Sequence, residues 1–172
     1  MRRRGRAHFA IPNAVADEIW TDKPMDGDGA DEAARELLRR LRAPSDLPYE
    51  RGDFLVAGPG FGLAAASDRV ALALARAELG GVLSQGLPPA LRNSLLLAGV
   101  PTLEAPALLP FIEHGHDLIV DFAAGTLENV SRHRVQVGRG LTPSELQWVR
   151  AAPAQQWYGA GLRPHTLGSG DV

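Results

Sequence analysis

Apolar residues in the first half of the chain follow a pattern whose period changes partway along. Residues 54–57 form a continuous apolar run bounded by glycine on both sides, which is typical of a strand buried on both faces. After a glycine-rich turn, Val70, Leu74 and Ala77 recur at helical spacing. The pattern therefore predicts a strand, a turn and a helix in succession, with Ser67 at the helix N-cap.

The hydrophobic periods elsewhere extend this unit into an alternation of strands and helices. Strands are expected at Arg6–Ile11, Val82–Ser84, Val100–Glu104, Leu118–Phe122, Leu127–Val130 and Arg134–Val137, and helices at Ala30–Arg42, Pro88–Ala98 and Ser144–Ala151, the last capped by Thr142 or Ser144. Helical crossovers make the earlier strands parallel, whereas the short turn at 123–125 predicts an antiparallel hairpin. The pattern indicates an α/β fold with a small mixed sheet and flanking helices.

Composition places the chain among ordinary globular proteins. With 172 residues, 45% of them apolar and 22% charged, it is expected to form one domain over 1–172. A net charge of −2 argues against a nucleic-acid partner, and the basic run Arg2–Arg4 is expected to be a solvated tail. No apolar run approaches about twenty residues and no signal peptide is recognisable, so we expect a cytoplasmic protein without a membrane partner.

The chain offers few ligands for a metal. It contains no cysteine, so any iron–sulfur cluster must belong to another chain. His114 and His116 stand two residues apart and are consistent with either a metal pair or a solvent-exposed loop. The sequence has no third ligand near them, so we predict the exposed loop and no metal site.

The glycine-rich turn is the strongest candidate for a binding site. Gly58, Gly60 and Gly62 let a ligand approach the backbone closely, and the following helix N-terminus, with Arg69 close by, suits a carboxylate or a phosphate. No Gly-Lys-Ser/Thr follows, which argues against a nucleotide loop. A purely structural turn remains the alternative.

Two further polar features have a functional and a structural interpretation. The segment 13–25 carries Asp17, Trp20 and Lys23 without any period, which suits either a binding loop or a tryptophan at the edge of the core. Arg92-Asn93 is a polar pair within an apolar helix, and the simplest expectation is that both side chains face water.

Several short motifs occur in an order that carries a resemblance. They are Gly5-Arg6-Ala7, Asn13-x-x-x-Asp17-Glu18-Ile19, Gly52-Asp53-x-x-Val56-Ala57-Gly58, Phe61-Gly62, Arg92-Asn93-Ser94 and Gly99-Val100-Pro101. Over about residues 5–161, leaving 1–4 and 162–172 as tails, the chain resembles the small subunit of 3-isopropylmalate dehydratase, a member of the aconitase swivel-domain family. The resemblance implies a swivelling β/β/α domain partnered by a large subunit with a [4Fe–4S] cluster. It further implies that the complex isomerises a 2-hydroxy di- or tricarboxylic acid by dehydration and rehydration.

The glycine loop departs from this family. The family loop reads N-F-G-C-G-S-S-R-E-H, in which the second serine is the base and the arginine grips a substrate carboxylate. Without a gap, Ala65 and Ala66 replace the serines and Ser67 replaces the arginine. Shifted by one residue, Ser67 becomes the base and Arg69 the carboxylate clamp. The ungapped register is preferred for the helix, because Leu72-Ala73-Leu74 then matches the family's buried leucines, and a local bulge in the loop would allow the shift. Residues expected to bind substrate are thus Gly60, Gly62, Ser67, Asp68 and Arg69.

Three functions are compatible with these departures. A working hydro-lyase subunit is favoured because the glycine loop and the helix N-terminus remain and Ser67 and Arg69 could serve the reaction. The family's I-I-P-x-R-Y-L is here replaced by the sequence around Trp20, which predicts a substrate side group other than isopropyl. A noncatalytic paralogue gains weight from Ala65 and Ala66, and a stand-alone binder of small acids is the third alternative.

Overall fold

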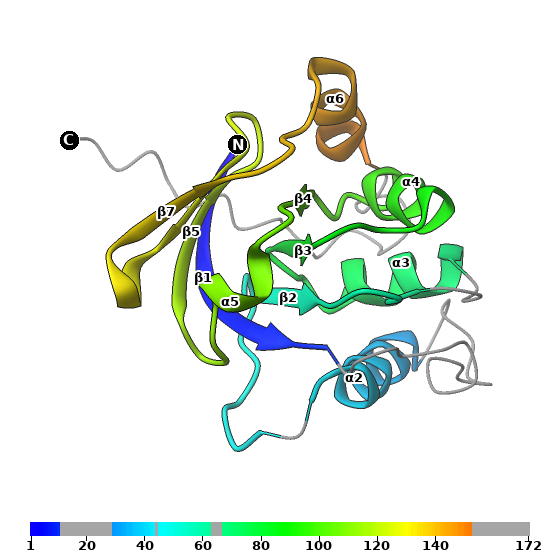
Figure 1. Ribbon diagram of the computed structural model, residues 1–172. Helices are drawn as coiled ribbons and strands as arrows, with labels where there is room; N and C mark the ends of the chain where they lie inside the picture. The colour runs from blue at the N-terminus through cyan, green and yellow to red at the C-terminus, as the bar shows by residue number, and fades with distance from the viewer. Residues whose placement is uncertain (11–28, 44, 63–66, 153–172) are drawn as a thin grey trace, which may run out of the picture.

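The computed structural model describes residues 1–10, 29–43, 45–62 and 67–152 (Figure 1). Its strands form one seven-stranded sheet in the order β4-β3-β2-β1-β5-β6-β7. The strands are β1 (Arg2–Phe9), β2 (Phe54–Ala57), β3 (Gly81–Ser84), β4 (Thr102–Glu104), β5 (Asp117–Asp121), β6 (Thr126–Asn129) and β7 (Arg134–Val137). The helices are α2 (Ala30–Leu41), α3 (Ser67–Arg76), α4 (Pro89–Leu97), α5 (Leu108–Phe111), the 3-10 turn η1 (Val130–Arg132) and α6 (Pro143–Ala151).

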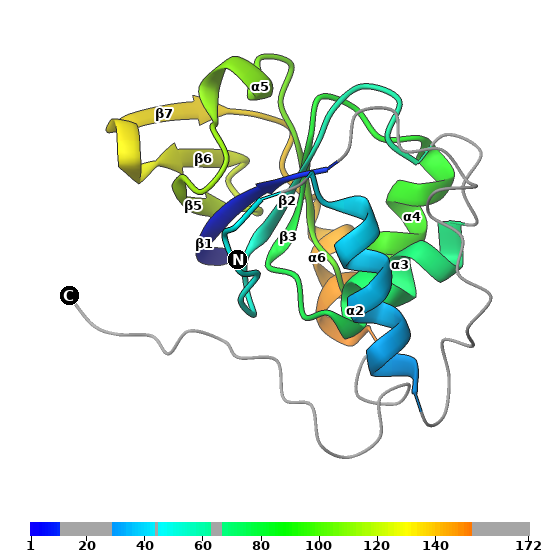
Figure 2. The same ribbon diagram turned by 90° about the horizontal axis from the view of Figure 1, so that it is seen from below.

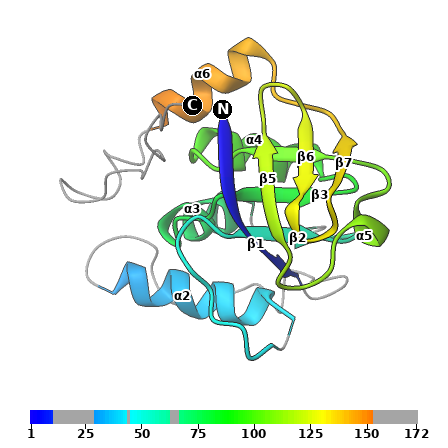
Figure 3. The same cartoon turned by 90° about the vertical axis from the view of Figure 1, so that its left-hand side faces the viewer.

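The sheet has a parallel half and an antiparallel half that share β1. Strands β1 to β4 run parallel, each paired with the next along the chain, and β1, β5, β6 and β7 run antiparallel. Residues 7–9 of β1 pair with β2, while residues 2–6 pair with β5, so the strand crosses from one half to the other (Figure 3). The mixed sheet and the parallel arrangement of β2 and β3 confirm the prediction from the sequence.

The prediction that Arg2–Arg4 forms a solvated N-terminal tail is wrong, because this run is part of β1. Carboxylates stand beside this run on the antiparallel half, where Arg4 pairs with Asp117. The guanidinium of Arg3 turns the other way and donates to the carbonyl of Gly80 at 2.8 Å. Consecutive arginines can therefore occupy a strand when hydrogen-bond acceptors lie on both sides of it, and composition alone does not reveal such acceptors.

The sheet curls until its two ends approach. Strands β4 and β7 lie at opposite edges, yet Glu104 at the end of β4 bridges to Arg139, just after β7, in antiparallel fashion. The backbone N–H of Arg139 donates to the carbonyl of Glu104 at 2.7 Å. This curl gives the sheet an inner face, whose core is built around Phe54, Leu103 and Phe122.

Helices α2, α3 and α4 lie side by side on the other face of the parallel half (Figure 2). The apolar stripe predicted for the first helix is buried as expected, with Leu37, Leu38 and Leu41 at most 4% exposed. Asp31 in its first turn and Arg39 in its last complement the helix dipole. The helical layer thus positions the N-terminus of α3 between two neighbouring helices.

Most predicted element ends agree with the structure to within two residues. The chief exception is the first strand, which begins four residues earlier than expected; its predicted end at Ile11 lies outside the described residues.

Thr142 is the N-cap of α6, in a reciprocal capping box with Glu145. The short helix α5 was not predicted, because four residues give no readable period. No described helix is long and apolar enough to cross a membrane.

Candidate functional site

The glycine loop leaves the carboxyl end of β2 and is pinned against α4. Gly60 and Gly62 have positive φ angles of 81° and 76°, which side chains other than glycine adopt at a cost. A Cβ atom on Gly62 would stand 2.1 Å from Cδ2 of Leu91, so α4 approaches the bare backbone there. The sequence predicted that the glycines admit a ligand; for Gly62 the structure gives a packing reason as well.

The helix N-terminus lies within one residue of its predicted position, because Ser67, expected to be the N-cap, is the first residue of α3. Helix α3 begins at Ser67, and both Asp68 and Arg69 in its first turn are exposed. The hydroxyl of Ser94 on α4 donates to Oδ1 of Asp68 at 2.5 Å. This contact ties the first turn of α3 to the same helix that holds Gly62.

The structure brings part of the predicted site together. Gly60 and Gly62 precede the start of α3, and Asp68 and Arg69 follow it, so these four flank one short segment. The predicted covering residues Asp17, Trp20 and Lys23 lie outside the described residues. Ala65 and Ala66 also lie outside the described residues. The choice between the ungapped and the shifted register of the loop therefore stays a prediction.

Asp68 fits poorly as a ligand for an anion. Its carboxylate already interacts favourably with the positive end of α3, and Ser94 occupies one of its oxygens. A substrate carboxylate arriving at the same amides would meet a like charge. Within the predicted binding site, the backbone N–H groups of the first turn of α3 and the side chain of Arg69 suit a carboxylate better than the side chain of Asp68 does.

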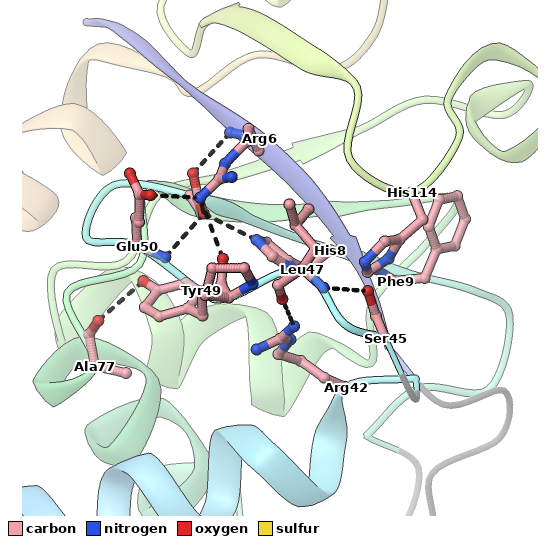
Figure 4. Close-up of polar contacts among 12 residues, drawn as sticks. Arg6, His8, Phe9, Arg42, Ser45, Leu47, Tyr49, Glu50, Ala77 and His114 are labelled. Carbon is pink, nitrogen blue, oxygen red and sulfur yellow. Dashed lines mark hydrogen bonds and ion pairs between the residues drawn. The ribbon is translucent and has the colours of Figure 1, made fainter.

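A second polar centre, missed by the sequence analysis, lies between β1 and β2 (Figure 4). His8 is fully buried and its Nε2 lies 2.8 Å from Oδ2 of Asp53, which is only 3% exposed. The backbone N–H of Arg6 donates to Oδ1 of Asp53 at 2.8 Å, and that of Glu50 donates to Oδ2 at 2.9 Å. The signal that could have pointed to this centre was an aspartate directly before a strand predicted to be buried on both faces.

Aromatic and basic side chains enclose the pair. The ring of His8 lies 5.6 Å from that of Tyr49 and 5.3 Å, edge to face, from that of His114. Burial, followed by the nearby charge of Asp53, raises the pKa of Tyr49. Burial also lowers the pKa of His114, with His8 and Arg42 adding to the shift.

The exposed histidine loop expected from the sequence is wrong. His114 and His116 are both half-buried, because the loop packs back on β1 and β6. His114 Nδ1 accepts from the backbone N–H of Phe9 at 3.4 Å, and His116 Nδ1 accepts from that of Glu113 at 3.0 Å. No group of three potential metal ligands occurs among the residues that the structure describes.

The His8–Asp53 centre connects β1 to the segment before β2. The pKa of Asp53 predicts that this centre contributes less to the stability of the fold in acid. Burial by itself would raise the pKa of Asp53, but the hydrogen bonds from His8 and from two backbone N–H groups outweigh it and hold that pKa below the ordinary 3.8. Folding therefore favours the ionised form. This contribution is complete above the unfolded pKa and is lost as the pH falls through the lower folded value.

We accordingly expect Asp53→Asn to lower the free energy of unfolding at pH 7 by about 1–3 kcal/mol, because one buried acceptor of charge-assisted bonds is lost. The deficit should shrink below pH 4, where the wild-type carboxylate also takes up a proton. Urea unfolding at pH 7 and at pH 3 measures both. Asp46→Asn, at an exposed aspartate, is the matched control and should change the stability by less than about 0.5 kcal/mol. A deficit that is equal at both pH values would contradict a stabilising role for the ionised form of Asp53.

The polar pair on α4 is divided between water and the interior. Asn93 is exposed, as expected, but Arg92 is only 7% exposed, so its predicted exposure is wrong. The buried Arg92 side chain is paired with two carboxylates. Its Nη1 lies 2.6 Å from Oε1 of Glu145, and its Nε lies 3.1 Å from Oε1 of Glu104. The partners come from α6 and β4, so only the tertiary structure brings them to Arg92.

Comparison with known proteins places this architecture. No protein-family model matches the chain. The 3-isopropylmalate dehydratase small subunit of Aquifex aeolicus is 25% identical over 153 residues, covering 88% of this chain and 90% of that protein. The protein of the same name from Clostridium botulinum is 28% identical over 141 residues, covering 82% and 88%.

A solved structure shares the fold. The crystal structure of 3-isopropylmalate dehydratase from Methanocaldococcus jannaschii matches with a TM-score of 0.74 over 88% of this chain and 90% of that one, at 17% sequence identity. A sequence identity of 17% shows only that the fold is shared. The sequence similarity to the two small subunits extends over most of the chain. Together they make this chain a divergent relative of the 3-isopropylmalate dehydratase small subunits.

Proposed function

We propose that this chain is the small subunit of an aconitase-type hydro-lyase that isomerises a 2-hydroxy di- or tricarboxylic acid. The observation that carries the proposal is the strand, glycine loop and helix unit from Phe54 to Arg76, in a chain whose relatives bear the small-subunit name. Because the segment around Trp20 departs from the family pattern, the substrate is a relative of 3-isopropylmalate with a different side group.

In this proposal the substrate carboxylate binds at the end of the glycine loop. The N–H groups at the start of α3 form the positive end of the helix dipole and attract negative charge, and Arg69 adds a cation in the same turn. Its planar guanidinium can meet a carboxylate with two hydrogen bonds. Asp17, Trp20 and Lys23 cover one side of the site, and the large subunit covers the other.

The proposed complex takes its cluster from the partner. This chain has no cysteine, and its described residues contain no group of three potential ligands, so a [4Fe–4S] cluster would be held by the large subunit. When bound there, such a cluster supplies a Lewis acid for the departing hydroxyl. The small subunit contributes the anion site and, in the shifted register, the base Ser67.

A noncatalytic paralogue is the second candidate. It is favoured by Ala65 and Ala66, which stand where the family has its serines in the ungapped register, and by the carboxylate of Asp68 at the start of α3. Such a chain would still bind the large subunit and influence its stability or its regulation. It would not lower the barrier to proton transfer.

Coexpression with a cluster-bearing large subunit separates these functions. The proposal expects a one-to-one complex with the brown colour of the cluster, and turnover of at least one member of a panel of 2-hydroxy di- and tricarboxylates. A complex without turnover of any member supports the noncatalytic paralogue instead. If no complex forms, the small-subunit role itself is contradicted.

Asp68→Asn should improve anion binding by the complex. Removing a like charge near the helix N-terminus is worth about 0.3–1 kcal/mol, or roughly a two- to fivefold decrease in Kd for malate at low salt. The gain should shrink as salt screens the exposed charge. Calorimetric titration measures the change, and Glu128→Gln, on β6 in the antiparallel half, is the control for overall charge. Unchanged affinity at low salt would place the anion elsewhere.

A further inference from the structure

Arg92 holds three separate elements together inside the protein. It lies on α4, its Nη1 donates to Oε1 of Glu145 on α6 at 2.6 Å, and its Nε lies 3.1 Å from Oε1 of Glu104 on β4. The side chains of these three residues are 8%, 11% and 19% exposed. The contact with Glu104 lacks the alignment of a hydrogen bond. Arg92 therefore interacts with that carboxylate mainly through the attraction of opposite charges.

Glu145 connects this ion pair to the start of α6. Its Oε2 accepts from the backbone N–H of Thr142 at 2.9 Å, while the hydroxyl of Thr142 accepts from the backbone N–H of Glu145 at 3.3 Å. The hydrogen bond from Arg92, assisted by the capping contacts, lowers the pKa of Glu145 to about 2 despite its burial. The carboxylate is therefore ionised at neutral pH, and it fixes α6 and α4 to each other.

A different side of α4 contacts the glycine loop and the start of α3. Leu91 packs on the bare backbone of Gly62, and Ser94 donates to Asp68 in the first turn of α3. At about 100° per residue, Leu91, Ser94 and Leu95 share one side of the helix, whereas Arg92 and Leu96 point to another. The packing agrees, since Leu91 and Leu95 belong to the core under the helices and Leu96 belongs to the core inside the curled sheet.

Removing the cation would leave two carboxylates with no counterion between them. Glu104 and Glu145 come from different elements, so their repulsion and their need for water would push α4 away from β4 and α6. Leu91 and Ser94 would move with the helix. Any such movement reaches Gly62 and Asp68, because both make direct contact with α4.

We propose that Arg92 is a positioning residue for the glycine loop and the N-terminus of α3, acting through α4 from a different side of that helix. Among the residues that the structure describes, the side chain of Arg92 pairs with Glu104 and Glu145 and has no hydrogen bond to Gly60 or Gly62. Its effect on turnover rests on the proposed function, but its effect on the position of Gly62 and Asp68 does not.

The test compares two arginines of similar burial. Arg92→Met is set against Arg76→Met, because the side chain of Arg76 is 9% exposed and pairs with Asp31 at 2.9 Å at the far end of α3. In the full chain, labelled with ¹⁵N, the amide resonances of Gly62 and Asp68 should shift in Arg92→Met and stay in place in Arg76→Met. In the reconstituted complex, kcat should fall at least tenfold for Arg92→Met and stay within twofold for Arg76→Met.

A rescue that also neutralises both carboxylates separates positioning from general loss of stability. Arg92→Met combined with Glu104→Gln and Glu145→Gln removes the unpaired carboxylates while keeping the side chains' shapes, and it should return the two resonances and kcat most of the way to wild type. If Arg92→Met leaves the Gly62 and Asp68 resonances unmoved, or if Arg76→Met moves them equally, the inference is wrong. If the wild-type complex turns nothing over, the proposed function fails, and the resonances still decide the role of Arg92.

Discussion

Ser67→Ala is expected to lower kcat of the reconstituted complex by about 10²–10⁴-fold, the usual effect of losing a positioned proton-transfer group. In the shifted register Ser67 is the base, and it is the first residue of α3. Helix dipoles favour negative charge at that end, so the position suits a hydroxyl that must lose its proton at neutral pH. KM should change little, because the backbone amides and Arg69 still bind the carboxylate.

Ser94→Ala is the matched control for this prediction. Ser94 is a second serine beside the start of α3, but its hydroxyl is committed to Asp68. Its replacement should leave kcat within a few-fold, and both variants should copurify with the large subunit in the same amount as wild type. Full activity of Ser67→Ala would show that the shifted register is wrong and that the proton is taken by a group of the large subunit.

Gly62→Ala is expected to destabilise the chain by about 2–5 kcal/mol. A Cβ in the left-handed region costs about 1–2 kcal/mol, and forcing a methyl group against a packed side chain adds about 1–3 kcal/mol. The added Cβ would stand 2.1 Å from Cδ2 of Leu91, so the loop or α4 must move. Denaturant unfolding measures the loss, and ligand affinity should fall with it because the loop leads directly into α3.

Two variants separate the contributions to this loss. Gly52 also has a positive φ, 88°, but its nearest neighbour is 3.9 Å from an added Cβ, so Gly52→Ala should cost only the conformational part. Leu91→Ala in the Gly62→Ala background opens space for the new methyl group, and the double variant should be more stable than the two single losses predict. Strict additivity would contradict a direct clash between the two residues.

Local periodicity predicted the scaffold well for a physical reason. Strand β2 is buried along its whole length, and such strands appear as continuous apolar runs. Helices α2 and α4 bury leucines at helical spacing, and Thr142 with Glu145 satisfies a capping rule confined to four residues. These features depend only on neighbours in the sequence, so the sequence alone is enough to find them.

The polar centres were missed because their partners are distant in sequence. His8 meets Asp53 across 45 residues and Arg92 meets Glu145 across 53, and only the curled sheet with its helical layer brings them together. Arg92 looked like a solvated charge for the same reason. The start of α3 was predictable from Ser67, but the contact between Asp68 and Ser94 was not.

A crystal structure of the reconstituted complex with a bound, unreactive substrate analogue would show whether the start of α3 binds a substrate carboxylate. We expect one carboxylate of the analogue within hydrogen-bond distance of the backbone N–H groups at Ser67–Arg69, with the guanidinium of Arg69 beside it. An analogue whose carboxylates are all bound by the large subunit, with the start of α3 unoccupied and Arg69 turned away, would contradict it.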